Sequence, residues 1–467
     1  MLKIALLLLL VLVFGSSYGF QFLKWKHGLP PIGAPNARAR APVLRTLTQR
    51  IDHFNPRDTR TFTMRYYSND QFYAEGGPIF IMIGGEWEIS PSYLMTGLMF
   101  DMAVEHSGYL FYTEHRYYGN THPTADHSSE NLSYLSIDQS LADLVYFIEY
   151  QKSIIPGGSN SKVVIVGGSY AGTMATWARI KYPHLIDAAW SSSGPLRASS
   201  DFYEYFDHIG QEIRRVDEAC YNSITEAMDQ VMASLATEEG VQQMSELFNT
   251  CDTIDTSEPE ISYFFSNFAN PWAWAIQYAE SSATIQSECN WFNSFGGSSL
   301  DKMVGYMNYF NGGWCISDLK FYIEYYSSSQ ITGDAGRAWI YQCCTEFGWL
   351  QTGSENQPFA EFSNQFVLEI CNQLFSADEY ILSVAVNRTN LFYGSVYPEV
   401  TRLVSVHGSL DPWMSIGVQS DINEEAPVII VPDAAHCADL GSISAYDTEE
   451  MRAAKTRIMA LIREWIS

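Results

Sequence analysis

The sequence predicts an α/β protein whose mostly parallel sheet is interrupted by a long helical insertion. Two observations carry this prediction. Strand-like and helix-like runs alternate between residues 49 and 200, which is typical of a parallel sheet with crossover helices. Residues 201–390 instead contain helical stretches, many aromatic residues and most of the cysteines, and β-branched runs return only at Arg402.

Hydrophobic periodicity locates the expected elements. Short apolar or β-branched runs mark six strands: Thr61–Tyr67, Pro78–Ile83, Leu110–Glu114, Lys162–Val166, Arg402–Val406 and Val428–Val431. Apolar residues at helical spacing mark the main helices: Ser136–Ile154, Thr173–Lys181, Ile224–Leu235 and Thr448–Ile466. We therefore expect a first core part (46–200), a helical cap insertion (201–395) and a second core part (396–467).

The N-terminus has the composition of a secretory signal peptide. Lys3 precedes the apolar run Ile4–Phe14, and small residues up to Gly19 suit cleavage, which predicts a signal peptide over 1–19. The run is short for a membrane span, and a signal anchor is the alternative interpretation. No later stretch reaches about 18 consecutive apolar residues. Residues 20–45, with several prolines, are expected to form an irregular leader or propeptide. The sequence thus predicts a secreted or lysosomal protein without a membrane span.

Composition excludes several classes of partner. The 53 acidic residues against 27 basic ones give a net charge of −26, which argues against nucleic acid and anionic membranes as partners.

The eight cysteines fit an oxidising compartment, and their pairing stays open. None shows paired C-x-x-C spacing, so a zinc site is not expected. No cofactor is expected for the chain. The sequons at Asn131 and Asn387 predict glycosylation in exposed loops.

The segment from Val163 to Gly172 carries the sharpest chemical signal. A β-branched strand runs into small residues around Ser169, and a helix follows. This is the setting of a nucleophile elbow, in which a serine sits on a tight turn at the end of a strand. Gly167 meets the usual G-x-S-x-G pattern, while Ala171 replaces its second glycine. Because such a turn can also be structural or bind phosphate, the interpretation depends on finding partners for the serine.

Those partners are an acid and a base. A serine hydroxyl becomes nucleophilic when a base takes its proton and an acid orients that base. Asp411 follows one expected strand and His436 follows the next. The order Ser169, Asp411, His436 is that of α/β-hydrolases, and the three strand ends meet at one edge of the sheet. The rival candidates for the two roles are His407, Asp433 and Asp439.

An oxyanion hole requires two backbone N–H donors. One is expected from Tyr170, which directly follows the predicted nucleophile. The other is expected from Gly85 or Glu86, in the turn after the strand at 78–83. The alternative interpretation of this turn is an ordinary strand ending.

These residues belong to a set of motifs that resembles the prolyl carboxypeptidase family of serine peptidases. The resemblance extends from about Gln49 to the C-terminus. The matching stretches are Gln49–Asn55, Gly84–Glu86, Glu114–Gly119, Gly167–Gly172, His407–Trp413 and Ala435–Cys437. The stretch Trp177–Leu185 is most similar to the thymus-specific branch of the family.

The resemblance implies an α/β-hydrolase core, a helical cap inserted between the last core strands, and cleavage at proline near a peptide end. It assigns the catalytic triad to Ser169, Asp411 and His436. The implied substrate pocket contains Trp413, Thr173 and Met174. A flat indole ring suits a proline ring, which agrees with this assignment.

The chain also departs from the family pattern. Thr173 stands where the family often has a methionine, Leu440 where it often has an aromatic residue, and Trp87 where it often has a glycine. These differences leave the strictness of a proline preference open, but not the hydrolysis.

The leading expectation is a serine exopeptidase that cleaves peptide substrates through an acyl-enzyme. An esterase or lipase of the same fold, and a catalytically inactive binding protein, are the alternatives, because fold alone does not separate them. The sequence does not decide between trimming from the amino or the carboxyl end, nor between a monomer and a homodimer.

Overall fold

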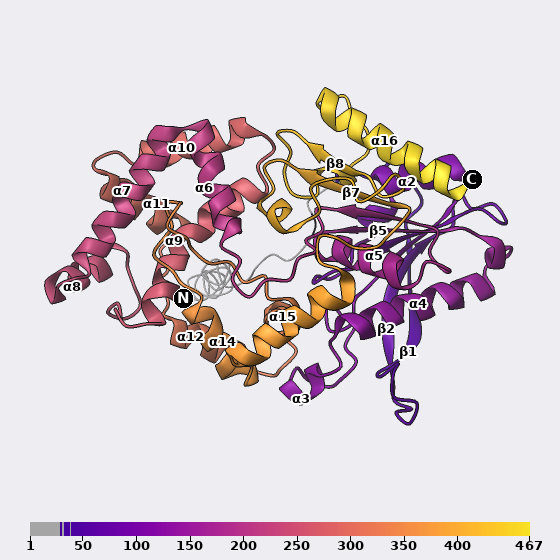
Figure 1. Ribbon diagram of the computed structural model, residues 1–467, viewed down its shortest axis with the longest axis horizontal. Coiled ribbons are helices and arrows are strands. Elements are labelled where there is room, and N and C mark those ends of the chain that lie inside the picture. The colour runs from indigo at the N-terminus through magenta and orange to yellow at the C-terminus, as the bar shows by residue number, and fades with distance from the viewer. Residues whose placement is uncertain (1–28, 30–31, 38) are drawn as a thin grey trace, which may run out of the picture.

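The computed structural model describes residues 29, 32–37 and 39–467 (Figure 1). The predicted signal peptide (1–19) and part of the predicted leader (20–28, 30–31 and 38) lie outside the described residues. Among the described residues, none of the helices combines the length and the apolar character that a membrane span requires.

An eight-stranded mixed sheet forms the core, with strand order β1-β2-β4-β3-β5-β6-β7-β8. The six strands from β4 to β8 along this order are parallel, whereas β1 and β2 are antiparallel to their neighbours. The strands are β1 (Val43–Arg50), β2 (Thr61–Asn69), β3 (Ile79–Ile83), β4 (Tyr109–Thr113), β5 (Val163–Gly168), β6 (Ala188–Ser192), β7 (Leu403–Gly408) and β8 (Val428–Val431). The predicted α/β-hydrolase fold, with its mostly parallel sheet, is confirmed.

Helices cover both faces of this sheet (Figure 1). Because side chains alternate along a strand, Ile79 and Ile81 pack on the face covered by α4 and α5, while Phe80 and Met82 pack on the face covered by α2 and α16. The covering helices are α2 (Leu98–His106), α4 (Ile137–Ile154), α5 (Tyr170–Lys181) and α16 (Glu449–Ile466). A short helix, α3 (Ser129–Leu132), precedes α4.

A helical insertion separates β6 from β7 and lies beside one end of the sheet (Figure 1). Its helices are α6 (Glu204–Val216), α7 (Glu218–Ser234), α8 (Glu238–Leu247), α9 (Glu260–Gln277), α10 (Ser282–Ser294), α11 (Ser299–Phe310), α12 (Leu319–Ser327), α13 (Gly336–Gln342), α14 (Gln365–Phe375) and α15 (Glu379–Tyr393). Several begin at Asp, Ser or Thr residues whose side chains accept the N–H group at the third helical position.

Three disulfides cross-link this insertion: Cys220–Cys289, Cys251–Cys315 and Cys344–Cys371. The other two cysteines, Cys343 and Cys437, are free and buried. The disulfides are consistent with the oxidising compartment that the cysteine count predicts.

The structure corrects two local predictions. β1 begins at Val43, so the predicted irregular leader is wrong for its last three residues, which pair with β2 as an edge strand. The sequons were expected in loops, but Asn131 lies in α3 and Asn387 on α15. Asn387 is exposed, whereas Asn131 is partly buried and donates from Nδ2 to Asp126. Short polar sequons carry no signal of the surrounding helix, which is why the loop prediction failed.

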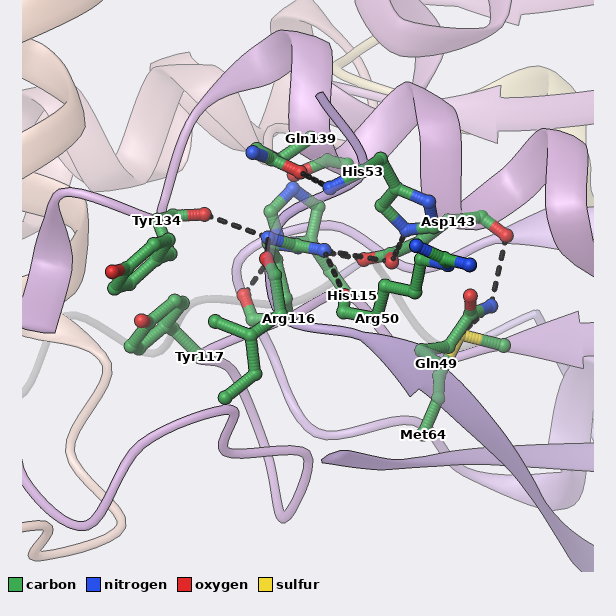
Figure 2. A network of polar contacts seen from close by, with 12 residues as sticks. Gln49, Arg50, His53, Met64, His115, Arg116, Tyr117, Tyr134, Gln139 and Asp143 are labelled. Atoms are coloured by element: carbon green, nitrogen blue, oxygen red, sulfur yellow. Dashed lines mark hydrogen bonds and ion pairs between the residues drawn. The ribbon is translucent and has the colours of Figure 1, made fainter. Parts of the chain in front are cut away.

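A buried ion-pair network joins two of the matching motifs to the core (Figure 2). Arg116 donates to both carboxylate oxygens of Asp143 on α4, at 2.6 and 2.7 Å. Its Nη1 also donates to the carbonyl oxygens of Ile51 and Tyr134. His53 Nε2 lies 2.7 Å from the same carboxylate. The network therefore ties the end of β1 and the loop after β4 to α4.

Candidate active site

Ser169 lies on a strained turn between β5 and α5. Its backbone has φ 58° and ψ −133°, a conformation that residues with a side chain rarely adopt. The turn is tight enough that a Cβ on Gly167 would lie 2.0 Å from the carbonyl oxygen of Ala171. Small residues around the serine are therefore a steric requirement, which is the geometry expected of a nucleophile elbow.

Asp411 and His436 form a buried hydrogen-bonded pair. Asp411 follows β7, His436 follows β8, and His436 Nδ1 lies 2.9 Å from Asp411 Oδ2. The other carboxylate oxygen accepts the backbone N–H of Trp413 at 3.0 Å, and both side chains are almost fully buried. Burial opposes protonation of His436, but the Asp411 carboxylate outweighs it and raises the pKa of the imidazole well above its usual value. Conversely, burial would raise the pKa of Asp411, but the charge of His436 lowers it.

The end of β6 brings the His436 segment next to the elbow. The carbonyl oxygen of Ser192 accepts the backbone N–H of Ser169 at 2.9 Å and lies 3.6 Å from Cys437 Sγ. The hydroxyl of the next residue, Ser193, accepts the Cys437 N–H at 2.9 Å. A hydrogen bond from Ser193 also lowers the pKa of Asp411. Two consecutive serines thus hold all three predicted residues at one edge of the sheet.

The hydroxyl of Ser169 forms no hydrogen bond with His436 in this structure, nor with any other described residue. Hydrogen bonds of this kind are often long or misaligned without substrate and form in the complex. The observed partnership is therefore the Asp411–His436 pair, with Ser169 beside it on the neighbouring turn.

The predicted oxyanion donors lie on adjacent strand ends. Tyr170 is the first residue of α5, where backbone N–H groups have no carbonyl one turn upstream. Gly85 and Glu86 follow β3, which pairs directly with β5 in parallel. A Cβ on Gly85 would lie 2.4 Å from the ring of Trp87, so any other residue at this position would force the ring to move. Their role as donors stays a prediction.

The three predicted pocket residues lie in different surroundings. Trp413 packs against Phe202 and Tyr205, and only 8% of its surface is exposed to solvent. Thr173 is fully buried and its hydroxyl donates to the Pro195 carbonyl at 2.5 Å. Met174 is buried within the hydrophobic core. A role for these side chains in substrate binding stays a prediction.

The rival residues have other partners. Asp439 accepts hydrogen bonds from Trp190 and Ser192, and burial raises its pKa to about 6. Asp433 caps the start of α10 through Ser282. His407 is buried, and this burial lowers its pKa to about 4, so it is neutral at physiological pH. In the described part of the chain, no cluster of histidine, cysteine and acidic residues could hold a metal ion.

Known proteins match this chain over most of its length. The family model described as serine carboxypeptidase S28 matches residues 49–458. The chain belongs to this family. It is a serine peptidase.

The relatives of this S28 peptidase include proteins from several animals. A Caenorhabditis elegans protein named as a serine protease is 33% identical, over 91% of this chain and 88% of its own. Mouse thymus-specific serine protease is 30% identical, over 94% and 90%. Human lysosomal Pro-X carboxypeptidase is 27% identical, over 90% and 87%. Among solved structures, proline iminopeptidase of Mycobacterium smegmatis aligns over 90% of this chain and 98% of its own, at 8% identity and a TM-score of only 0.36.

Sequence reasoning missed Gln277, which supports the candidate site of this S28 peptidase. Gln277, the last residue of α9, accepts the backbone N–H of His436 at 3.0 Å through its carbonyl oxygen. Its side-chain oxygen accepts the Trp413 indole N–H at 2.9 Å and the Tyr205 hydroxyl at 2.7 Å. The helical insertion therefore positions both the histidine and the tryptophan. No motif surrounds Gln277, so only the tertiary contacts identify it.

A second buried cluster, formed by Gln342 and Glu346, contacts the elbow through the side chain of Tyr170. The Tyr170 hydroxyl accepts from Gln342 Nε2 at 3.0 Å, and the same Nε2 lies 3.0 Å from Glu346 Oε2. Glu346 also accepts the backbone N–H of Ile137 on α4. Burial raises the pKa of Glu346 to about 7. The cluster joins the elbow of this S28 peptidase to its helical insertion.

Proposed function

We propose that this S28 peptidase is an exopeptidase that cleaves near proline through an acyl-enzyme on Ser169. The observation that carries the proposal is the buried Asp411–His436 pair beside a serine in the backbone conformation of a nucleophile elbow. A serine on such a turn, a histidine and an orienting acid are the elements of covalent acyl transfer.

Each residue has a defined part in the proposed reaction. His436 takes the proton of Ser169 Oγ as the oxygen attacks the scissile carbonyl, and then gives it to the leaving amine. Asp411 orients the imidazole and stabilises its positive charge, in line with the raised pKa of His436. The N–H groups of Tyr170 and of the Gly85–Glu86 turn stabilise the oxyanion. Water then hydrolyses the acyl-enzyme by the same route in reverse.

Two features support a preference for proline. Trp413 offers an indole ring two residues after the acid, within an aromatic cluster that includes Phe202 and Trp349. The names of several relatives include Pro-X carboxypeptidase. The insertion, which contacts the site through Gln277, would restrict access to short or unstructured peptide ends.

A fluorophosphonate probe tests the nucleophile, with Ser169→Ala as the control. We expect the folded wild type to be labelled and the variant to be unlabelled, with loss of peptide hydrolysis in parallel. Labelling at another residue, or none in the folded wild type, would remove Ser169 from this role. Proline-containing dipeptide and tripeptide amides, compared with simple acyl esters, then test peptide specificity.

A further inference from the structure

We propose that a cavity in the helical insertion is a distal subsite for an aromatic or other large apolar side chain of the peptide substrate. The cavity has a volume of about 390 Å³ and lies among α6, α9, α12 and α14. This inference rests on the peptide hydrolysis proposed above and adds a preference at a position remote from the cleaved bond.

The walls of the cavity are mainly apolar. Phe206, Tyr263 and Phe362 are buried in them. At the mouth, Trp314 and Phe321 remain 44% and 43% exposed, although both are large hydrophobic residues. Exposed apolar surface gathered at one concave site is typical of a binding site. A large apolar side chain from a ligand would bury this surface.

The polar groups of the cavity suit a peptide that is not acidic. Asp252 and Asp318 line it, whereas no Lys, Arg or His occurs among the described residues of its wall. The side-chain nitrogen of Asn311 is buried and has no hydrogen-bond partner in the described part of the chain. A buried donor without a partner is costly, and a peptide carbonyl entering the cavity would satisfy it.

Helix α9 connects the cavity to the active site. Tyr263, Asn267 and Asn270 of this helix line the cavity, and Gln277 at its end holds His436 and Trp413. Residues seven apart lie on the same side of a helix, so Asn270 and Gln277 share one stripe. The two are separated by about 10 Å along the axis, which an extended peptide spans in about three residues.

Aromatic side chains lie between the active site and the cavity. Tyr278 faces the His436 ring with centroids 6.0 Å apart, and Trp274 packs on Tyr278 at 4.6 Å. Trp274 lies one turn from Asn270 and is 53% exposed. A peptide bound at Ser169 that follows this surface would place a side chain about three to five residues from the cleaved bond at the cavity.

The experiment compares peptides of equal length that differ at a single position. This position carries Phe, Ala or Glu and lies three, four or five residues from the cleaved bond, on either side of it. We expect kcat/KM for the Phe peptide to exceed that for the Ala peptide about tenfold at one position, since burial of the ring is favourable. The Glu peptide should be the poorest. Asn270→Trp, which would place a bulky indole ring at the wall of the cavity, should abolish the preference for Phe and leave the hydrolysis of short amides unchanged.

The matched control is Asn290→Trp, because Asn290 is an exposed residue of α10 that does not line the cavity. Calorimetry with the Ser169→Ala protein measures binding of the Phe peptide without turnover. Equal kcat/KM for the Phe and Ala peptides at every position, or a preference that survives Asn270→Trp, would overturn the subsite. Failure of fluorophosphonate labelling and of short-amide hydrolysis would instead overturn the proposed function.

Discussion

At the scale of single residues, the predicted nucleophile and two residues of neighbouring segments have strained backbones. Ser169, Ser193 and Cys437 all have positive φ angles, of 58°, 52° and 57°. Such conformations are costly for residues with side chains and persist only where the surroundings impose them. Here the imposing contacts are hydrogen bonds among the same segments, from Ser169 to Ser192 and from Cys437 to Ser193. Strain that three neighbouring segments share is typical of a site with fixed geometry.

Replacement of the two buried acids near His436, Asp411 and Asp439, should affect kcat to very different extents. Asp411→Asn should reduce kcat about 10⁴-fold with little change in KM, because the amide no longer stabilises the imidazolium or fixes its tautomer. The Asp411 carboxylate is the one that contacts His436, at 2.9 Å. Steady-state kinetics on a proline-containing amide measure the effect, with circular dichroism as a check on folding.

Asp439→Asn is the matched control for this prediction. Asp439 is equally buried, but it bonds to Trp190 and Ser192 and not to the imidazole. We expect its replacement to change kcat by much less than that of Asp411. A greater loss of kcat in the Asp439 variant than in the Asp411 variant would show that Asp411 is not the catalytic acid.

At the scale of elements, the sequence predicted the strands whose residue types are unambiguous. β5, β7 and β8 are rich in valine and isoleucine, and the predicted nucleophile, acid and base each follow one of them. β6 was not predicted, since Ala188–Ser192 consists of small residues and one tryptophan with no alternating pattern. It becomes a strand because β5 and β7 pair with it on both sides. Tertiary pairing therefore decides where local propensity is weak.

The supporting residues of the site were beyond sequence reasoning for a related reason. Gln277 and Glu346 lie in the helical insertion, far in sequence from the residues that they contact. Both are polar residues in helices, where a solvent-exposed position is the ordinary expectation. Their importance follows only from the packing of the insertion against the sheet, and no spacing rule describes that packing.

The network around Arg116 yields a prediction about element packing (Figure 2). Arg116→Met should lower the free energy of unfolding by about 3–5 kcal/mol, because it leaves the Asp143 carboxylate buried without its main partner. It also removes the donors to two carbonyl oxygens at the ends of β1 and α3. Chemical denaturation followed by tryptophan fluorescence measures the change.

Arg463→Met serves as the control for Arg116. Arg463 pairs with Glu105 at the surface, where water and salt weaken the interaction. We expect its denaturation midpoint to match that of the wild type. Equal destabilisation of the two variants would mean that the buried network does not join β1 and β4 to α4.

At the scale of the whole molecule, the protein consists of a sheet core and an insertion that both contribute residues to the candidate site. The core supplies Ser169, Asp411 and His436 from strand ends, and the insertion supplies Gln277. The three disulfides lie entirely within the insertion, and the core contains none among its described residues. Apart from the two chain connections, core and insertion are therefore held together by noncovalent contacts, so the residues at the junction determine how stably the two parts pack.

Glu346 lies at this junction and makes its stability depend on pH. It belongs to the insertion, yet it accepts the N–H of Ile137 on α4 and contacts Gln342, which bonds to Tyr170. Burial raises the pKa of Glu346 from 4.5 to about 7, so the folded state favours the neutral acid. Its contribution to stability is present below about pH 4.5 and is lost as the pH rises to about 7, at about 3 kcal/mol in total.

Glu346→Gln removes this ionisation and keeps an acceptor oxygen for Ile137. We expect the variant to be more stable than the wild type at pH 8, by up to about 3 kcal/mol, and close to it at pH 5. Denaturation at both pH values measures the difference, and Glu324→Gln, at an exposed position on α12, should show none. A difference that is the same at pH 5 and pH 8 would contradict the raised pKa. If the expected result holds, acidic conditions tighten the junction between insertion and core, because a neutral Glu346 no longer carries a buried charge behind Tyr170.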